Sequence, residues 1–198
     1  MHTLIVVAHP VPTSLTHAIA HRLGEGIAQA GTGATFEIAD LAAEGFDPRF
    51  NTADVALFEK RAAAPEDVLA EQARLDGADA LVVVYPIYWW SFPALLKGWI
   101  DRVFAQGWAY EDNPEGKVIK KLQRLKVHLV ANGGADQGMI ERHGYGTAMA
   151  TQIDHGIFDY CGARVLSSRL LLASDPGYPA THLDAARDIG RAIVLNED

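Results

Sequence analysis

Residue types suited to ligand binding gather in three short segments of the chain, residues 9–14, 86–92 and 132–138. The first segment places hydroxyl groups just before a predicted helix, where backbone N–H groups attract anions such as phosphate. The second contains several aromatic rings, which stack on flat ligands. The third opens with paired glycines, whose backbone N–H groups can approach a ligand closely. Together the three segments indicate a site for a planar molecule that carries a phosphate.

Each segment also allows a purely structural interpretation. Thr13 and Ser14 follow two prolines that exclude a helix, and either hydroxyl is a suitable N-cap for a helix over residues 15–30. Ser14 therefore either helps to hold a phosphate or only caps its helix. The rings at residues 88–90 form either a ligand wall or the filling of a core or subunit contact. The glycines of residues 132–138 form either a donor loop or an ordinary flexible turn.

The apolar pattern predicts the scaffold that brings these segments together. We expect strands at residues 3–8, 34–39, 81–85, 125–131 and 164–173, and helices at residues 15–30, 53–63, 65–76, 93–104, 148–160 and 180–195. Residues 106–116 are expected to be a loop and residues 117–124 a partly helical surface piece. The alternation predicts an α/β fold of one domain, residues 1–198, with a doubly wound five-stranded parallel sheet and helices on both faces. Of the common orders of such sheets, we expect 2-1-3-4-5. The three segments then meet at the carboxyl edge of the sheet, where such sheets bind ligands.

A phosphate cradle, an aromatic wall and backbone donors at one sheet edge fit a flavin mononucleotide-like group better than a bare nucleotide. The sequence has no G-x-G-x-x-G after the first strand, no P-loop and no G-x-S-x-G motif, which disfavours dinucleotide folds, P-loop ATPases and α/β-hydrolases. His17 and His21 have the i, i+4 spacing of metal ligands, but an adjacent glutamate and a third ligand are missing. We therefore expect no metal site and interpret the pair as solvated or capping residues.

The composition disfavours several classes of partner. The chain has 17 basic and 25 acidic residues and a net charge of -8, so we expect no nucleic-acid partner and no anionic membrane surface. Cys161 is the only cysteine, which excludes an intramolecular disulfide and favours a reducing, cytoplasmic setting. The amino-terminal residues do not have the pattern of a secretory signal, and no apolar run approaches the roughly 20 residues that span a bilayer. We expect a protein without membrane insertion.

Four motifs match one known family: A-H-P with T-S over residues 8–14, P-A-L-L-K-G-W with D-R-V-F over residues 93–104, Gly133-Gly134, and F-D-Y-C-G over residues 158–162. The second motif is the specific one, because paired glycines alone are a weak signal. On these motifs the chain resembles the NAD(P)H:quinone oxidoreductases, also called DT-diaphorase-like or modulator-of-drug-activity-like proteins. The resemblance covers most of the chain and implies a flavodoxin-like fold.

The resemblance also implies a flavin site built from the three segments. It assigns the flavin phosphates and ribityl chain to His9, Thr13, Ser14, Leu15 and Thr16, the flavin ring to Pro86, Ile87, Tyr88, Trp89 and Trp90, the pyrimidine edge to Asn132, Gly133 and Gly134, and the adenosine to Arg187. Thr16 stands where relatives often have asparagine, which puts its hydrogen bond in doubt. Arg187 matches a basic residue of members that bind FAD, so we favour FAD over FMN. An exposed helix charge is the alternative interpretation of Arg187.

Three further residues are implied in the acceptor pocket. Tyr110 matches a tyrosine that closes over the flavin from the partner subunit, which implies a homodimer. His143 lies 18 residues before Cys161, where related enzymes place a histidine beside the reactive edge. The tyrosine expected shortly before that histidine is absent, so Tyr145 is our candidate for the hydroxyl, and a Tyr145–His143 proton relay is a hypothesis. The alternative for His143 is a histidine in a surface loop.

The resemblance implies an NAD(P)H dehydrogenase (quinone) with a ping-pong mechanism. NAD(P)H would deliver hydride to the flavin and leave, and a quinone or similar planar acceptor would then take two electrons in the same place. Neither the choice between NADH and NADPH nor the physiological acceptor follows from the sequence. Azo dyes and nitro compounds are alternative acceptors. A flavin-bearing regulatory subunit of a potassium-efflux transporter and a flavodoxin-type electron carrier are the alternative functions.

Overall fold

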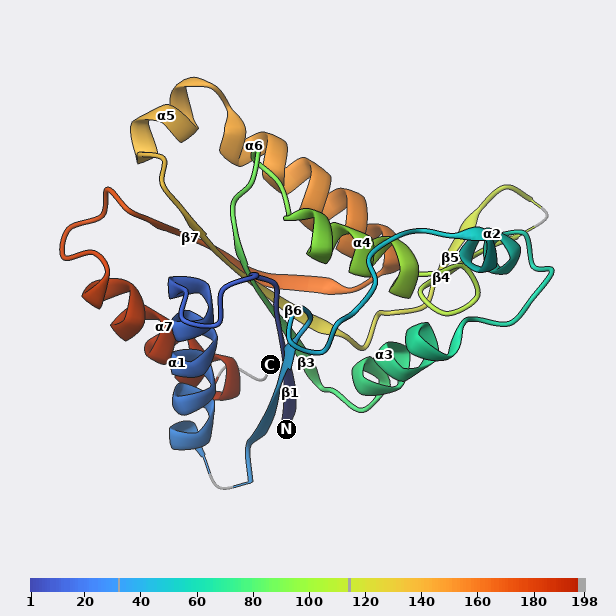
Figure 1. The fold of residues 1–198 in the computed structure, drawn as a ribbon, viewed down its shortest axis with the longest axis horizontal. Helices are drawn as coiled ribbons and strands as arrows, with labels where there is room; N and C mark the ends of the chain where they lie inside the picture. Colours follow the sequence, from blue (N-terminus) through green and yellow to red (C-terminus); the bar gives the residue numbers. More distant parts are fainter. Residues whose placement is uncertain (32, 114, 196–198) are drawn as a thin grey trace.

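The computed structural model describes residues 1–31, 33–113 and 115–195, and its centre is one parallel sheet (Figure 1). Five strands form this sheet in the order β2-β1-β3-β6-β7, which is the predicted order 2-1-3-4-5. The strands are β1 (His2–Val7), β2 (Thr35–Asp40), β3 (Ala80–Pro86), β6 (Lys126–Gly133) and β7 (Arg164–Leu172). All of their pairings are parallel. The predicted fold class is confirmed.

β3 is the central strand, and its sequence explains its position. Every residue of β3 is buried, and most of them are aliphatic or β-branched. A strand covered on both faces of a parallel sheet needs such a continuous apolar run, since neither face meets water. Val84 pairs with Val7 of β1 on one side and with Val130 of β6 on the other. This register fixes where β3 and β6 end relative to each other.

Helices cover both faces of the sheet (Figure 1). α1 (Leu15–Ala30) and α7 (Ala180–Leu195) lie side by side on one face. Their backbones approach closely at two glycines: a Cβ on Gly26 would lie 2.0 Å from the Arg187 carbonyl oxygen, and a Cβ on Gly190 would lie 2.2 Å from that of Leu23. Only glycine fits such contacts, so the two helices depend on these residues for their packing.

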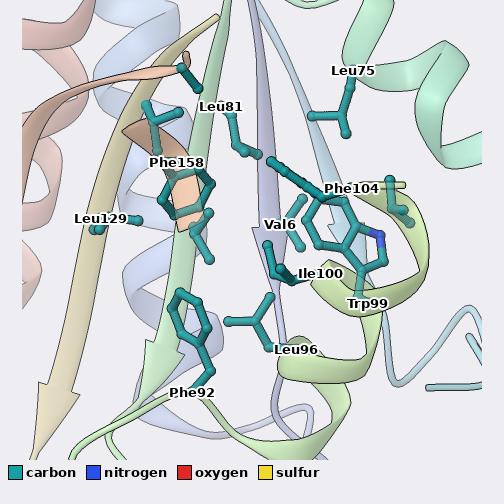
Figure 2. Close-up of a cluster of buried hydrophobic side chains, with 14 of the residues drawn as sticks. Val6, Leu75, Leu81, Phe92, Leu96, Trp99, Ile100, Phe104, Leu129 and Phe158 are labelled. Atoms are coloured by element: carbon teal, nitrogen blue, oxygen red, sulfur yellow. The ribbon is translucent and has the colours of Figure 1, made fainter. Parts of the chain in front are cut away.

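The opposite face is covered by α3 (Glu66–Asp76), α4 (Ala94–Val103) and the π-helix η1 (Ala150–Asp159). Figure 2 shows Leu96, Trp99 and Phe104 from the α4 segment packed with Phe158 of η1 against the sheet. These α4 residues have the helical spacing that predicted a core face, and that prediction is confirmed. The Trp99 indole nitrogen is satisfied within this core, because it donates to Glu71 Oε2 at 2.8 Å.

Between β3 and β6 the structure differs from the prediction. Residues 117–124 were expected to be partly helical, but Val118–Lys120 forms β5, which pairs antiparallel with β4 (Tyr110–Asp112). The prediction was wrong because long-range contacts hold the segment extended: the Lys121 and Leu122 amides both donate to the Cys161 carbonyl. Cys161 lies about 40 residues further along the chain, outside any local window of sequence.

The remaining helices are short. α2 (Thr52–Phe58) has a capping box formed by Asn51 and Asp54, and it ends earlier than predicted as the chain turns at Lys60, whose φ is 58°. α5 (Gln137–Arg142) and α6 (Tyr145–Met149) lie after the glycine segment, where only a loop was expected before residue 148. No helix within the described ranges has the length and apolar character to cross a membrane.

Candidate active site

Two adjacent pockets open at the carboxyl edge of β3 and β6, and both are lined by Ile87, Gly133 and Gly134. The first has a volume of about 130 Å³ and the second of about 200 Å³. The first is completed by Trp89, Trp90 and Ala135, and the second by Leu15, Pro86, Tyr88, Asn132, Leu171, Ala173 and Tyr178. The predicted aromatic and glycine segments therefore meet, and the start of α1 joins them.

The strand register explains why these segments meet. Pro86 pairs with Asn132 at the ends of β3 and β6, and the Ile87 amide extends the pairing by donating to the Asn132 carbonyl at 2.8 Å. A Cβ on Gly133 would lie 3.0 Å from Ile87 Cδ1, which is closer than ordinary packing allows. The absence of a side chain at Gly133 lets the two segments lie in contact. Gly133 thus has a steric role in the pocket wall, whereas a Cβ on Gly134 would meet nothing within 4 Å.

Trp89 and Trp90 form a tight turn with an unusual backbone. Their φ angles are 49° and 60°, and the flanking Tyr88 and Ser91 exchange backbone hydrogen bonds of 3.1 and 3.0 Å. Two consecutive left-handed residues are usual for Asn-Gly and cost about 1–2 kcal/mol for each larger residue. Such strain persists where the surroundings over-determine it, and it clusters at ligand sites. The Ser91 hydroxyl anchors this turn by donating to Gln152 Oε1 at 2.9 Å.

Trp90 is the first ring of an aromatic stack that includes two of the predicted catalytic residues, Tyr145 and His143. The Trp90 and Tyr145 rings lie 3.7 Å apart with an interplanar angle of 10°, and Tyr145 and His143 lie 5.2 Å apart at 24°. Tyr145 is half-buried and His143 is exposed. The structure therefore joins His143 and Tyr145 to the pocket residue Trp90 through stacked rings, although neither His143 nor Tyr145 itself lines either pocket.

The start of α1 presents free donors. Ser14 is the N-cap, and its Oγ accepts from the His17 amide at 3.3 Å. Within the described ranges the amides of Leu15 and Thr16 donate to no acceptor of the chain, as expected in the first turn of a helix. The Gly134 and Ala135 amides, outside any helix or strand, are likewise without an acceptor in that part of the chain. This donor set suits a phosphate at one end and a polar ring edge at the other.

Thr16 links two of the predicted segments. Its side chain is buried, and its hydroxyl donates to Asn132 Oδ1 at 3.0 Å. The bond joins the first turn of α1 to the end of β6, and it also orients the Asn132 amide. Thr13, by contrast, is exposed beside the helix start.

His17 and His21 were interpreted as solvated or capping residues, and His17 is not solvated. Only 5% of His17 is exposed, its Nδ1 lies 2.9 Å from Ser14 Oγ, and its Nε2 lies 2.8 Å from Asp40 Oδ2. The end of β2 brings Asp40 beside α1, which the local pattern of the helix could not reveal. Burial alone would raise the pKa of Asp40, but hydrogen bonds from the amides of Ala43 and Ala42 and from His17 outweigh burial and lower it.

Other predicted residues lie outside these pockets. Tyr110 is half-buried on β4 with its ring 5.5 Å from that of Tyr160, and it lines a small hollow beside Phe50 and Phe58. Arg187 lies on α7, pairs with Asp184 and lines neither pocket. His9 Nδ1 accepts from the Val11 amide at 3.0 Å, and its ring meets that of His17 edge to face at 6.2 Å.

Three pocket residues were missed by the sequence reasoning. Leu171 and Ala173 come from the end of β7, and Tyr178 from the loop that follows it. The rule that identified the other segments, a position just after a parallel strand, also applies to this one. The position after β7 was therefore a usable signal, but residues 173–178 have neither the paired glycines nor the several aromatic residues of the other loops.

The fold and the site together define a flavodoxin-like α/β protein with two adjacent pockets at the carboxyl edge of its sheet. The sequence profile of a family described as having the flavodoxin-like fold matches residues 1–191, and the chain belongs to this family.

Relatives with assigned names are oxidoreductases. The chain is 30% identical over 164 residues to an uncharacterized NAD(P)H oxidoreductase of Haemophilus influenzae, covering 82% of this chain and 79% of that protein. It is 30% identical over 189 residues to a ribosyldihydronicotinamide dehydrogenase (quinone) of Rattus norvegicus, covering 84% and 79%. The structure of the NAD(P)H:quinone oxidoreductase from Methanothermobacter marburgensis superposes with a TM-score of 0.87 at 27% identity, covering 98% and 97%. The predicted resemblance to this group is confirmed.

Proposed function

We propose that the protein is a flavin-dependent NAD(P)H:quinone oxidoreductase. One observation carries the proposal: the pocket at the edge of β3 and β6 joins an aromatic wall, a glycine floor and the donors of a helix start. The names of the H. influenzae, R. norvegicus and M. marburgensis proteins support the same reaction class. The buried Cys161 takes no part, because burial raises the pKa of its thiol to about 11.

The residues present fit a flavin. The free amides of Leu15 and Thr16, with the Ser14 hydroxyl, would hold its phosphate. Those of Gly134 and Ala135 would donate to the pyrimidine edge and stabilise negative charge there. A bound flavin would supply the redox chemistry, accepting hydride from NAD(P)H and passing two electrons to the acceptor.

The wall of Trp89 and Trp90 would orient planar partners and exclude water from the reacting face. The Tyr145 ring supports Trp90 by stacking on it at 3.7 Å, and His143 stacks on Tyr145 in turn. His143, exposed at the end of this stack, would supply a proton to the quinone oxygen. Tyr145 is proposed as its partner in a proton relay. A His143→Gln variant should keep flavin binding and its reduction by NAD(P)H but slow electron transfer to the acceptor, because the proton donor is lost; stopped-flow reduction and reoxidation would separate the two steps.

We favour FAD as the cofactor. Support comes from Arg187 on α7, which matches the basic residue of FAD-binding members, and from the second pocket, which extends from Gly133 to Tyr178. Chromatography of the flavin released from purified protein tests this choice directly. FMN as the only released flavin would contradict it.

We also propose that the protein acts as a cytoplasmic homodimer. Tyr110 lies far from the pocket of its own chain, and the surrounding surface exposes Phe50, Val55 and Phe58. An apolar surface of this kind is typical of a subunit contact. In a dimer Tyr110 would close the partner's site. The single buried cysteine agrees with a reducing compartment.

Spectroscopy and steady-state kinetics test the proposed function. The purified protein should show a flavin absorption spectrum, and NAD(P)H should bleach it. With a quinone as second substrate, double-reciprocal plots should give parallel lines. Intersecting lines would overturn the ping-pong order, and a protein that binds no flavin under any condition would overturn the function itself.

A further inference from the structure

Ser14, His17 and Asp40 form a continuous chain of hydrogen bonds at the start of α1. Ser14 Oγ lies 2.9 Å from His17 Nδ1, and His17 Nε2 lies 2.8 Å from Asp40 Oδ2. His17 is 5% exposed, so water does not compete for its ring nitrogens. The flavin site proposed above uses the Ser14 hydroxyl, but it gives His17 and Asp40 no role.

The partners of a neutral His17 decide which way the Ser14 hydroxyl points. Asp40 is a carboxylate, since its pKa is lowered, and it can only accept. A neutral ring therefore carries its proton on Nε2, and Nδ1 accepts from the Ser14 hydroxyl. Ser14 Oγ then has its proton directed at His17 and offers an anion only lone pairs. This state is poorly suited to a phosphate.

Protonation of His17 reverses the direction of the hydrogen bond between Ser14 Oγ and His17 Nδ1. Both ring nitrogens of an imidazolium donate, so Nδ1–H donates to Ser14 Oγ while Nε2–H continues to donate to Asp40. Ser14 Oγ also accepts from the His17 amide at 3.3 Å. With its acceptor positions filled, the hydroxyl proton is free to be donated outward, beside the free amides of Leu15 and Thr16.

We propose that His17 is a positioning residue that couples binding of the flavin phosphate to the uptake of one proton. The inference rests on the proposed function, because it assumes that a flavin phosphate occupies the start of α1. Asp40 balances the charge of the protonated ring. The bound phosphate and the imidazolium then stabilise each other through Ser14, without direct contact.

The other titratable groups near His17 are few in the described part of the chain. Asp40 approaches from β2 and His9 from the β1–α1 loop, with its ring centroid 6.2 Å from that of His17. His21 lies one turn further along α1 and is exposed. His9 is the group that could mimic the effect, so its contribution must be separated from that of His17.

The test measures binding of FAD and riboflavin to the flavin-free protein between about pH 5.5 and about pH 8.5, where histidine titrates. The FAD pyrophosphate stays ionised over this range, and riboflavin has no phosphate. FAD affinity should fall with rising pH, by up to tenfold per unit at the high end, while riboflavin affinity should stay constant. Calorimetry in buffers of different ionisation enthalpy should show uptake of about one proton with FAD only.

Variants identify the residue that takes up the proton when FAD binds. His17→Asn places an amide donor near the position of Nδ1, so FAD binding should stay measurable and become independent of pH. Ser14→Ala should abolish proton uptake and weaken the binding of FAD at low pH. His21→Asn is the matched control on the same helix and should keep the wild-type pH profile. In His9→Asn the FAD affinity itself should change, since His9 belongs to the proposed site, but its dependence on pH should persist. Thermal unfolding of each variant would show that it is folded.

The outcomes separate the two proposals. Wild-type FAD binding that is independent of pH, or a His17→Asn variant that keeps the wild-type profile, would overturn the role of His17 and leave the flavin site standing. If His17→Asn does not fold, the Ser14→Ala variant decides instead. Proton uptake on FAD binding that is as large in Ser14→Ala as in the wild type would overturn the role of His17. Absence of FAD and riboflavin binding at every pH would instead overturn the proposed function.

Discussion

Trp89 and Trp90 occupy the same strained turn but have different surroundings. Trp90 is half-buried and stacked on Tyr145, whereas 94% of Trp89 is exposed. The fold therefore gains little from the Trp89 ring, and its left-handed backbone carries a cost. Its position beside the first pocket supports the proposed role of the ring as a contact for a planar ligand.

Replacing Trp89 by glycine should separate ligand binding from folding. Glycine relieves the strain at φ 49°, so the free energy of unfolding should stay constant or rise by about 1 kcal/mol. Loss of ring stacking should raise the KM for quinones roughly 2–10-fold. Urea unfolding and steady-state kinetics measure the two effects. Leu69→Ala, at an exposed position on α3, is the control, and a large loss of stability in Trp89→Gly would contradict the assignment.

His128 gives the fold a specific acid sensitivity. It is buried on β6, bonded to Ser167 Oγ at 2.8 Å, and burial together with nearby Lys126 lowers its pKa to about 4. Below about pH 6.5 the unfolded chain binds a proton here that the folded chain does not. Stability should therefore fall, by up to about 3 kcal/mol, as the pH drops from about 6.5 to about 4.

The variant His128→Gln should reduce this dependence on pH, since a glutamine can keep a hydrogen bond to Ser167 without titrating. Urea unfolding at a series of pH values measures the difference. The exposed His155 offers a matched control, His155→Gln, which should retain the wild-type acid profile. Equal acid profiles for His128→Gln and the wild type would show that another group is responsible.

At the scale of elements, the contact between α1 and α7 fixes the position of the α1 start at the carboxyl edge of the sheet. α1 supplies the proposed phosphate donors, and its position depends on the glycine contacts with α7. Arg102 has a comparable role on the other face, where it joins α4 to Asp54 of α2 and Asp67 of α3. Long-range contacts of this kind place elements that local sequence only outlines.

Gly190→Ala should therefore be strongly destabilising. The new Cβ would lie 2.2 Å from the Leu23 carbonyl oxygen, so α1 and α7 must separate, at a cost of about 2–3 kcal/mol despite the better helix propensity of alanine. Flavin affinity should fall as α1 shifts. Gly31→Ala, whose Cβ would have only an ordinary 3.6 Å contact, is the control. Unchanged urea midpoints for Gly190→Ala would contradict the close packing.

For the whole molecule, the proposed dimer makes each site depend on two chains. Phe58→Glu places a charge on the exposed apolar surface beside Tyr110, and it should convert a dimer of 21.4 kDa chains into monomers in sedimentation equilibrium. The rate of quinone reduction should fall when the dimer dissociates, because Tyr110 then no longer closes the partner's site. Leu195→Glu, on a distant exposed position, should remain dimeric. A fully active wild-type monomer would contradict the proposal.

Much of the scaffold was predictable because its signals are local. The apolar runs of β1 and β3, the cap at Ser14 and the span of α7 could all be read from neighbouring residues. β5 was not predictable, since its extended form depends on pairing with β4 and on the Cys161 carbonyl.

The same division holds at the candidate site. The sequence alone predicted which segments reach the carboxyl edge of the sheet, because alternating strands and helices imply parallel strands whose carboxyl ends share one edge. Only the tertiary structure decided that Tyr145 stacks on Trp90, that Thr16 bonds Asn132 and that His17 lies between Ser14 and Asp40. These contacts join residues from different elements, and their distances depend on how the helices pack on the sheet. Periodicity carries no information about that packing.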